Sequence, residues 1–283
     1  MKIRRPVFAG SWYPGNANDC VRQINQFLEQ TPAQFPEKAA CGVIVPHAGW
    51  PFSGGIACRA ISLLAPEPAP DTIVVFGMHL PPGAAPVIMT DGGIDTPLGP
   101  LGIDTELAQA LEPQFPFEIE TPDGFSPDNT IELQLPFVKH FFPHSRLLPV
   151  GVPPASVAME IGNAAAEAIK TMGINARVVG STDLTHYGPS FGLTHYGLGD
   201  AAHEKVRKNE DSRIIDRMAA MDAEGVIREA LSAHNACCAG AAAAAITMAG
   251  ALDAQNATLT EYGTSYDKNP GDTFVGYAGI AMA

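Results

Sequence analysis

Basic residues are scarce in this chain of 283 residues, which carries 17 Lys and Arg against 30 Asp and Glu and a formal net charge of −13. Nucleic acids and anionic membrane surfaces attract basic patches, so this balance argues against both as main partners. No apolar run reaches the length that spans a bilayer. The basic N-terminal segment is not followed by the apolar core of a secretory signal. These absences favour a cytoplasmic protein whose partners are neither nucleic acid nor membrane.

Cysteines are few as well, and the five present show no CxxC spacing. An odd number without that spacing suits free thiols in a reducing compartment better than a disulfide framework. Several catalytic motifs are also missing: the GxSxG elbow, the Walker loop, the GxGxxG fingerprint and HExxH. The sequence therefore gives no support to an α/β-hydrolase, a nucleotide-binding protein or a zincin protease.

What the chain does contain is an alternation of helical and strand-like segments. Helical spacing of apolar residues is found in CVRQINQFLEQ, TELAQAL, VAMEIGNAAAEAIKTMG and the acidic segment 200–230. Strand-like runs are CGVIVP, DTIVVFG, RLLPVGV, ARVVGS and TFVGYAGIAM. This alternation predicts an α/β fold, a single domain over residues 1–283 with a central, mostly parallel sheet flanked by helices.

Three of the eight histidines follow the ends of predicted strands. His47 comes after GVIV, His79 after TIVVFG, and His186 after RVVG, with Asp183 just before it. Ligands of open α/β sheets bind beyond the carboxyl ends of the strands, so we expect these imidazoles to share one crevice. Imidazole is the commonest metal ligand and a natural acid–base group near neutral pH. The alternative is that each is a hydrogen-bonded loop residue without a chemical role.

An adjacent pair of cysteines, Cys237 and Cys238, opens an alanine-rich helical run in HNACCAGAAAAAITMAG. A thiol at a helix N-terminus has a lowered pKa and is more often a thiolate, which is the form that binds metals. The alternative is that both are small buried packing residues, as most free cysteines are. His203, in the acidic segment, is interpreted as a solvated residue of a charged helix.

The pentapeptide LTHYG occurs twice, at residues 184–188 and 193–197. Only the first copy, which contains His186, directly follows a predicted strand. His195 in the second copy is therefore interpreted as structural, and we expect the two copies to differ in role.

Eight short motifs follow one another along nearly the whole chain. In order they are RRPVFAGSWYPG, VPHAGWPFSG, TPLGPLGID, IELQLPF, STDLTHYG, HNACC, YGTSYD and VGYAGIAM. In this order they resemble the Memo family, known in microbes as AmmeMemoRadiSam system protein B. The resemblance implies a fold similar to that of the class III extradiol dioxygenases, with one α/β domain built around a central sheet.

The resemblance also implies a pocket in which two histidines and a cysteine hold a metal. Matched by motif, His47 and His79 are the histidine ligands and Cys238 is the cysteine ligand. Asp183 and His186 match polar residues that face the metal, and the resemblance implies that His186 acts as an acid–base group toward the substrate. We expect Asp183 to orient His186 or to accept a hydrogen bond from the substrate. Two histidines and one anionic ligand resemble the facial arrangement of non-haem iron sites, and a thiolate also suits copper. Iron or copper is therefore the expected cofactor, with zinc as a third candidate.

Three departures from the family pattern concern this pocket. The segment 77–79 is one residue shorter than the usual Gly-Pro-x-His. Asn129 stands where the family often has a histidine. Cys238 is not followed directly by glycine, as the family cysteine usually is, which makes Cys237 a rival ligand.

These features predict a metal-dependent, dioxygenase-like oxidoreductase that acts on an unknown small molecule. The alternative is a metal- or ligand-binding protein without turnover that works within a multi-protein modification system. The family name implies radical-SAM and AMMECR-type proteins as its partners there. Metal-assisted hydrolysis on zinc is a third option, since the same ligands can activate water.

Overall fold

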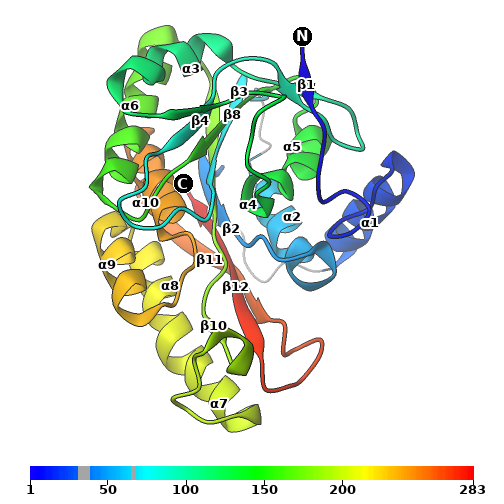
Figure 1. The fold of residues 1–283 in the computed structure, drawn as a ribbon, viewed down its shortest axis with the longest axis vertical. Coiled ribbons are helices and arrows are strands. Elements are labelled where there is room, and N and C mark those ends of the chain that lie inside the picture. Colours follow the sequence, from blue (N-terminus) through cyan, green and yellow to red (C-terminus); the bar gives the residue numbers. More distant parts are fainter. Residues whose placement is uncertain (31–38, 65–67) are drawn as a thin grey trace.

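Four parallel strands form the centre of the protein in a computed structural model that describes residues 1–30, 39–64 and 68–283. In order across the sheet they are β2 (Gly42–Val45), β9 (Ala176–Ser181), β3 (Thr72–Gly77) and β8 (Arg146–Gly151). Nearly all their residues are buried, as expected for strands with helices on both faces. Figure 1 shows them running through the middle of the molecule.

Further strands extend this centre on both sides. On one side β12 (Phe274–Met282) pairs antiparallel with β2, and β11 (Ala257–Thr264) and β10 (His186–Tyr187) pair antiparallel with β12. On the other side β4 (Val87–Met89) pairs antiparallel with β8 and parallel with β7 (Glu118–Glu120). The predicted α/β fold with a central sheet is thus confirmed, and the antiparallel pairs lie outside its four central strands.

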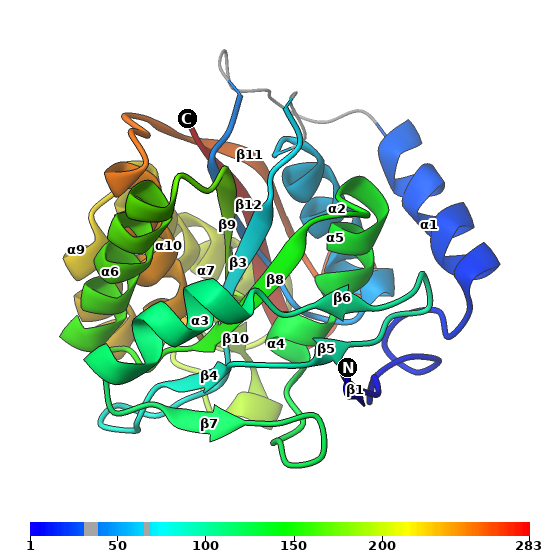
Figure 2. The same ribbon diagram turned by 90° about the horizontal axis from the view of Figure 1, so that it is seen from above.

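Helices cover both faces of the sheet (Figure 2). One face carries α3 (Thr105–Leu111), α6 (Ser156–Met172), α8 (Ser212–Ala219), α9 (Ala223–Ala233) and α10 (Ala239–Ala251). The other face carries α1 (Ala17–Glu29), α2 (Gly55–Ser62) and α5 (Leu135–Phe141). None of the helices in the described ranges combines the length and apolarity needed to pass through a bilayer.

The shorter elements lie at the edges of these layers. Two further helices are α4 (Asn129–Glu132) and α7 (Gly199–Val206), and a small separate sheet contains β1 (Ile3–Arg4), β5 (Gly93–Ile94) and β6 (Leu101–Gly102). Single turns are formed by Trp50–Gly54 and Arg207–Asp211, which are π-helical, and by Glu112–Gln114 and Pro189–Phe191, which are 3₁₀.

Small residues let α10 lie at the centre of its layer. Its alanines from Ala241 to Ala245 are fully buried, so this helix is apolar on all sides and covered on all sides. Gly162 of α6 approaches it so closely that a Cβ at this position would lie 2.5 Å from the carbonyl oxygen of Ala244. The close approach of the two backbones holds α10 against α6, and the cysteine pair immediately precedes α10.

The predicted helical segments TELAQAL and VAMEIGNAAAEAIKTMG form α3 and α6, and residues typical of helix ends bound them. Asp104 caps α3 by accepting a hydrogen bond from the Leu107 amide at 3.2 Å. Gly173 ends α6 in the left-handed conformation, with φ of 69°. The predicted first helix is α1, but it begins at Ala17 with Asn16 as its N-cap, before Cys20, the first residue of the predicted segment. The acidic segment 200–230 is helical, in several pieces.

His203 corrects one expectation. The residue is 6% exposed rather than solvated. Its ring stacks on Tyr266 at 4.3 Å between centroids, and its Nε2 lies 3.0 Å from the Thr264 hydroxyl. Both partners lie far along the chain, in β11 and the segment after it, so the charged sequence around His203 gave no sign of this burial.

The N-terminal segment is fastened to the body of the protein by the buried carboxylate of Glu132 in α4. This carboxylate accepts hydrogen bonds from the amides of Val7 at 2.9 Å and Phe8 at 2.7 Å, and from the Tyr13 hydroxyl at 3.1 Å. Glu132 belongs to the motif IELQLPF, and its partners belong to RRPVFAGSWYPG. Two of the motifs noted in the sequence therefore meet at one anchoring contact.

Candidate metal centre

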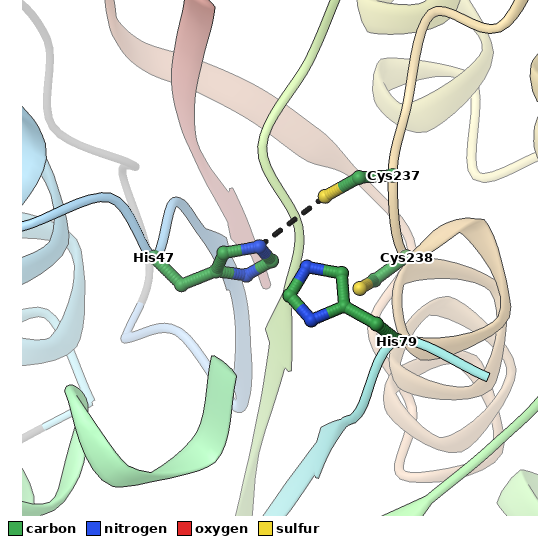
Figure 3. Close-up of side chains that lie close together, drawn as sticks. All are labelled: His47, His79, Cys237 and Cys238. Atoms are coloured by element: carbon green, nitrogen blue, oxygen red, sulfur yellow. Dashed lines mark hydrogen bonds between the residues drawn. The ribbon is translucent and has the colours of Figure 1, made fainter. Parts of the chain in front are cut away.

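The ends of β2 and β3 and the start of α10 meet at one edge of the sheet. His47 follows β2, His79 follows β3, and Cys237 and Cys238 immediately precede α10. Each of the four side chains offers a ligand atom, and these atoms all lie within 4.8 Å of one another. Figure 3 shows the two imidazoles and the two sulfur atoms turned toward a common point. The cluster thus contains the three ligands that the family resemblance implies, His47, His79 and Cys238, and also the rival Cys237.

The ring of His47 is buried and held by Ser181 at the end of β9. Its Nδ1 lies 3.1 Å from the Ser181 Oγ, and the Ser181 hydroxyl donates to the carbonyl of Thr130 at 2.7 Å. Because that hydroxyl has a single hydrogen, we assign the proton between His47 and Ser181 to Nδ1. The Nε2 of His47 then points to the cluster, 3.2 Å from the Cys237 Sγ.

The loop of His79 is held by Asp128. The Oδ2 of Asp128 accepts the backbone amide of His79 at 3.1 Å and lies 3.1 Å from its Nδ1. The preceding residue, Met78, has a φ of 71°, which is strained for a residue with a side chain. Its amide donates to the Thr130 hydroxyl at 2.6 Å, and its side chain packs onto Gly151. These contacts hold a left-handed turn in the shortened segment 77–79, and the turn brings His79 to the cluster.

The cysteine pair is held by the loop that follows β9. The amide of Cys237 donates to the carbonyl of Asp183 at 3.2 Å, and the amide of Cys238 donates to the Thr182 hydroxyl at 3.0 Å. Cys238 is the N-cap of α10, as the sequence predicted for the pair, and is 3% exposed. Cys237 lines an open cleft, so it is the sulfur that an incoming molecule can reach.

Charge is concentrated in this cluster. Burial opposes ionisation of Cys237, but the Cys238 thiol and the positive charge of His47 outweigh it, so the pKa of Cys237 lies well below its usual value. Burial and the neighbouring Cys237 charge raise the pKa of Cys238. The hydrogen bond to Asp128, followed by that to Cys237, raises the pKa of His79 to about 10. Cys237 is therefore the thiolate of the pair, and Cys238 is the thiol.

Asp183 lies between two imidazoles, although its closest contact is with the backbone. Its Oδ1 accepts the amide of His47 at 2.7 Å. Its Oδ2 is 3.9 Å from the Nε2 of His47 and 3.8 Å from the Nε2 of His186. These two distances are too long for hydrogen bonds, so Asp183 acts on both rings through its charge. Its direct hydrogen bond holds the His47 loop.

His186 faces the same cleft, and in the described part of the chain its buried Nε2 has no hydrogen-bond partner. Burial lowers the pKa of His186, but Asp183 and Cys237 outweigh burial and raise it to about 9. The ring lies 4.8 Å from that of Phe191, between centroids. The second LTHYG copy is different: His195 is outside the residues that line this cleft, with its Nε2 3.5 Å from the carboxylate of Glu210.

Asn129 supports the site from the side. Its amide nitrogen donates to the carbonyl oxygen of His47 at 2.9 Å. The residue that replaces the family's frequent histidine thus holds backbone rather than presenting a free imidazole to the cluster.

The sequence analysis missed the residues that orient the ligands, namely Ser181, Asp128 and Thr130. One signal was available for Asp128: it precedes α4 as an N-cap, accepting the Thr130 amide at 2.9 Å. Its second role, at His79, depends on a contact between residues 49 positions apart. No local pattern marks such a contact.

Comparison with known proteins settles which family this arrangement represents. A family model described as Memo-like protein matches residues 4–281. The chain belongs to the Memo family. The MEMO1 family protein of Methanopyrus kandleri is 34% identical to it, over 99% of this chain and 98% of the relative. That of Methanothermobacter thermautotrophicus is 32% identical, over 99% of this chain and 100% of the relative.

A solved structure, that of an uncharacterized protein from Escherichia coli K12, is more distant from this Memo family protein. It aligns with 85% of this chain and 98% of its own, with a TM-score of 0.49 and 15% sequence identity. The assignment to the family therefore rests on the sequence comparisons.

Proposed function

We propose that this Memo family protein is a metal-dependent oxidoreductase whose metal is held by His47, His79 and Cys237. The observation that carries the proposal is the cluster of imidazole and thiol ligand atoms within 4.8 Å of one another, open to a cleft that also contains His186. Cys238, the ligand implied by the family motif, belongs to the same cluster. Cys237 is the better placed of the two, because its sulfur contacts the His47 Nε2 at 3.2 Å and lines the cleft.

The donor set fits a metal ion. Metal–nitrogen bonds of about 2.0 Å and metal–sulfur bonds of about 2.3 Å place neighbouring ligand atoms of a four-coordinate site about 3.3–3.8 Å apart. The contact of 3.2 Å between His47 and Cys237 is close to that spacing. Both histidines also have an outer partner, Ser181 or Asp128, as metal-bound histidines usually do. Imidazole with thiolate suits copper or iron, and zinc is the third candidate.

The residues around the ligands would carry out proton transfer and stabilise charge. A bound redox metal supplies electron transfer to or from the substrate. His186 lines the cleft, so it would take or give a proton at a substrate held there, and its buried Nε2 has no hydrogen-bond partner among the described residues. Asp183 favours the protonated ring electrostatically from 3.8 Å.

The test has two measurements. Protein purified without chelators is expected to hold stoichiometric metal, and His47→Ala with His79→Ala is expected to lose it. Oxygen uptake with catechols and related small molecules is then compared for the parent, His186→Gln and His195→Gln. Uptake that disappears only in His186→Gln supports the enzyme, whereas metal-free parent protein contradicts the proposal.

A second candidate function has one observation in its favour. Asn129 uses its amide to hold the His47 backbone, so the pocket offers one imidazole fewer than the family pattern allows. A pocket that binds metal without turnover would fit this loss, and the protein would then act through radical-SAM and AMMECR-type partners in the cytoplasm. Metal binding without oxygen uptake by any substrate tried would favour this candidate, and a gain of uptake in Asn129→His would support it further. Oxygen uptake by the parent protein would exclude it.

A further inference from the structure

The sulfur of Cys237 has the surroundings of a nucleophile as well as those of a metal ligand. Its Sγ lies 3.2 Å from the Nε2 of His47, a contact drawn as the dashed line in Figure 3. The Nδ1 of the same ring lies 3.1 Å from the Ser181 Oγ, which fixes the direction of the ring. A nucleophile beside a base that a third group orients is the arrangement by which proteins activate thiols.

Cys237 is also the sulfur that a small molecule can reach. It lines the cleft, which has a volume of about 770 Å³, together with His79 and His186. Both of these imidazoles interact with the Cys237 sulfur. Cys238, in contrast, is 3% exposed and is not among the lining residues. A molecule that reacts at Cys237 therefore meets imidazoles that can give it a proton.

The charges around this sulfur favour a neutral reactant. The carboxylate of Asp128 lies behind His79, 3.1 Å from its Nδ1, and that of Asp183 lies behind His186, 3.8 Å from its Nε2. An approaching anion or cation would meet both signs of charge within a few ångströms. Hydroperoxides are small and uncharged at neutral pH, and accessible, activated thiols are the groups that oxidants of this kind attack.

We propose that Cys237 of the metal-free protein is a peroxide-reactive thiol, which a hydroperoxide oxidises to a sulfenic acid and a small thiol restores. The sulfur attacks one oxygen of the hydroperoxide ROOH, so that an S–O bond forms while the O–O bond breaks. The proton that Sγ shares with the His47 Nε2 passes to the leaving oxygen, which departs as the alcohol ROH. The sulfur is oxidised and the peroxide is reduced by the same electron pair.

The return reaction uses a thiol from outside the protein. Two molecules of a small thiol reduce the sulfenic acid to the Cys237 thiol and leave as their disulfide, with release of water. Cys238 is poorly suited to this role, because consecutive Cα atoms are about 3.8 Å apart whereas those of disulfide-bonded cysteines usually lie about 4.4–6.8 Å apart. The cleft that exposes Cys237 admits the external thiol.

Cys41 provides an internal reference for the test, since it is partly exposed like Cys237. Its sulfur lies 3.8 Å from the backbone carbonyl of Ala249 rather than beside an imidazole. Full-length protein freed of metal with a chelator is treated with hydrogen peroxide and dimedone, which labels sulfenic acids, and the labelled residues are located by tandem mass spectrometry. We expect Cys237 to be labelled at least about tenfold faster than Cys41, and dithiothreitol added before dimedone to abolish the label. Equal labelling of the two cysteines, or a Cys237–Cys238 disulfide in place of the sulfenic acid, would overturn the proposal.

A variant of the base tests the arrangement. His47→Gln removes the imidazole from the sulfur and is expected to slow the labelling of Cys237 by at least about tenfold. His140→Gln makes the same change in α5 and should keep the rate of the parent. Labelling of Cys41 in the same samples reports whether each variant is folded, since an unfolded chain would expose it. A rate in folded His47→Gln equal to that of the parent would overturn the role of His47.

This inference does not rest on the proposed function, because it concerns the protein without metal, and zinc separates the two. If Cys237 is a metal ligand, added zinc should protect it from labelling. Labelling that zinc leaves unchanged contradicts Cys237 as a ligand and leaves the peroxide-reactive thiol standing. Absence of labelling at Cys237 in the metal-free protein contradicts the peroxide-reactive thiol alone.

Discussion

At the scale of single residues, the cysteine pair shows how neighbours with the same side chain differ. Cys237 faces the cleft and contacts His47, whereas Cys238 caps α10 from a buried position. Burial alone would keep both thiols neutral, but the hydrogen bond with Cys238 and the positive charge of His47 lower the pKa of Cys237. The site therefore holds one thiolate and one thiol, because the negative charge of the Cys237 thiolate opposes ionisation of the adjacent Cys238.

The first prediction separates the two sulfur atoms. Cys237→Ser is expected to lose stoichiometric metal, because it removes the thiolate that contacts His47. Cys238→Ser should still bind metal, with an affinity lowered by no more than about 10–100-fold, the usual effect of losing a neighbour of a ligand. Metal analysis after dialysis measures both. Loss confined to Cys238→Ser would instead assign the ligand to Cys238, as the family motif implies.

The second prediction concerns pH. In the metal-free protein the pKa of His79 is raised to about 10, so its ring is protonated at neutral pH and must lose that proton to bind a metal. Protons compete with the metal at every pH below this value, and the competition weakens as the pH rises. The apparent metal affinity should therefore increase by up to about tenfold per pH unit between about pH 7 and pH 10. Competition titrations against a chelator of known pH dependence measure this, and a flat profile would contradict it.

At the scale of elements, the sequence predicted the strands better than their directions. Apolar runs mark β2, β3, β8, β9 and β12 clearly, because buried strands need such residues on both faces. Periodicity does not report direction, so the antiparallel course of β12 was not foreseen. The short strand β7, largely exposed, carries no apolar run at all.

For the site, likewise, the sequence predicted some features and not others. Histidines that follow apolar strands were found from the sequence, since strand ends are where α/β proteins bind ligands. The contacts that orient them were not, because Ser181 meets Thr130 and Asp128 meets His79 only once the sheet has formed. The choice between Cys237 and Cys238 likewise needed the start of α10 in three dimensions.

The third prediction tests the packing of α6 on α10. Gly162→Ala would place a Cβ 2.5 Å from a backbone oxygen of α10, so the helices must separate. The expected cost is about 1–3 kcal/mol in the free energy of unfolding. Gly250→Ala in α10 is the matched control, because its new methyl group meets only the flexible end of Met221 at 3.7 Å. That variant should be neutral or gain up to about 1 kcal/mol in urea unfolding. A neutral Gly162→Ala would show that the helices do not touch this closely.

At the scale of the whole molecule, long-range anchors join segments that are far apart in the chain. Glu132 ties α4 to the N-terminal segment by three hydrogen-bond donors, and the partners are separated by up to 125 positions. The buried Arg59 joins α2 to Glu261 of β11, 202 positions away. Contacts of this kind make the ends of the chain part of one cooperative structure.

The fourth prediction tests the anchor. Glu132→Gln removes the negative charge and replaces one carboxylate oxygen by an NH2 group, so the amides of Val7 and Phe8 and the Tyr13 hydroxyl are left with a single, neutral acceptor. We expect a loss of about 1–3 kcal/mol in the free energy of unfolding, because buried donors lose a charged acceptor. Faster proteolysis before residue 14 should accompany it. Glu118→Gln, at an exposed position of β7, is the control and should change neither measurement. Equal stability of the two variants would contradict the anchor.

The spread of the metal-binding residues along the chain has a consequence for biosynthesis. His47 and His79 leave the ribosome early, whereas Cys237 and Cys238 follow only near the end, after the strands that must position all four. An incomplete chain thus offers imidazoles alone, and only the finished, folded protein offers the complete ligand set. A metal that binds only this form adds about 2.7 kcal/mol of stability when it is present at a hundred times its dissociation constant. Metal loading would in this way act as a final maturation step, in which an ion retained by the protein marks a chain that has been completely made and correctly folded.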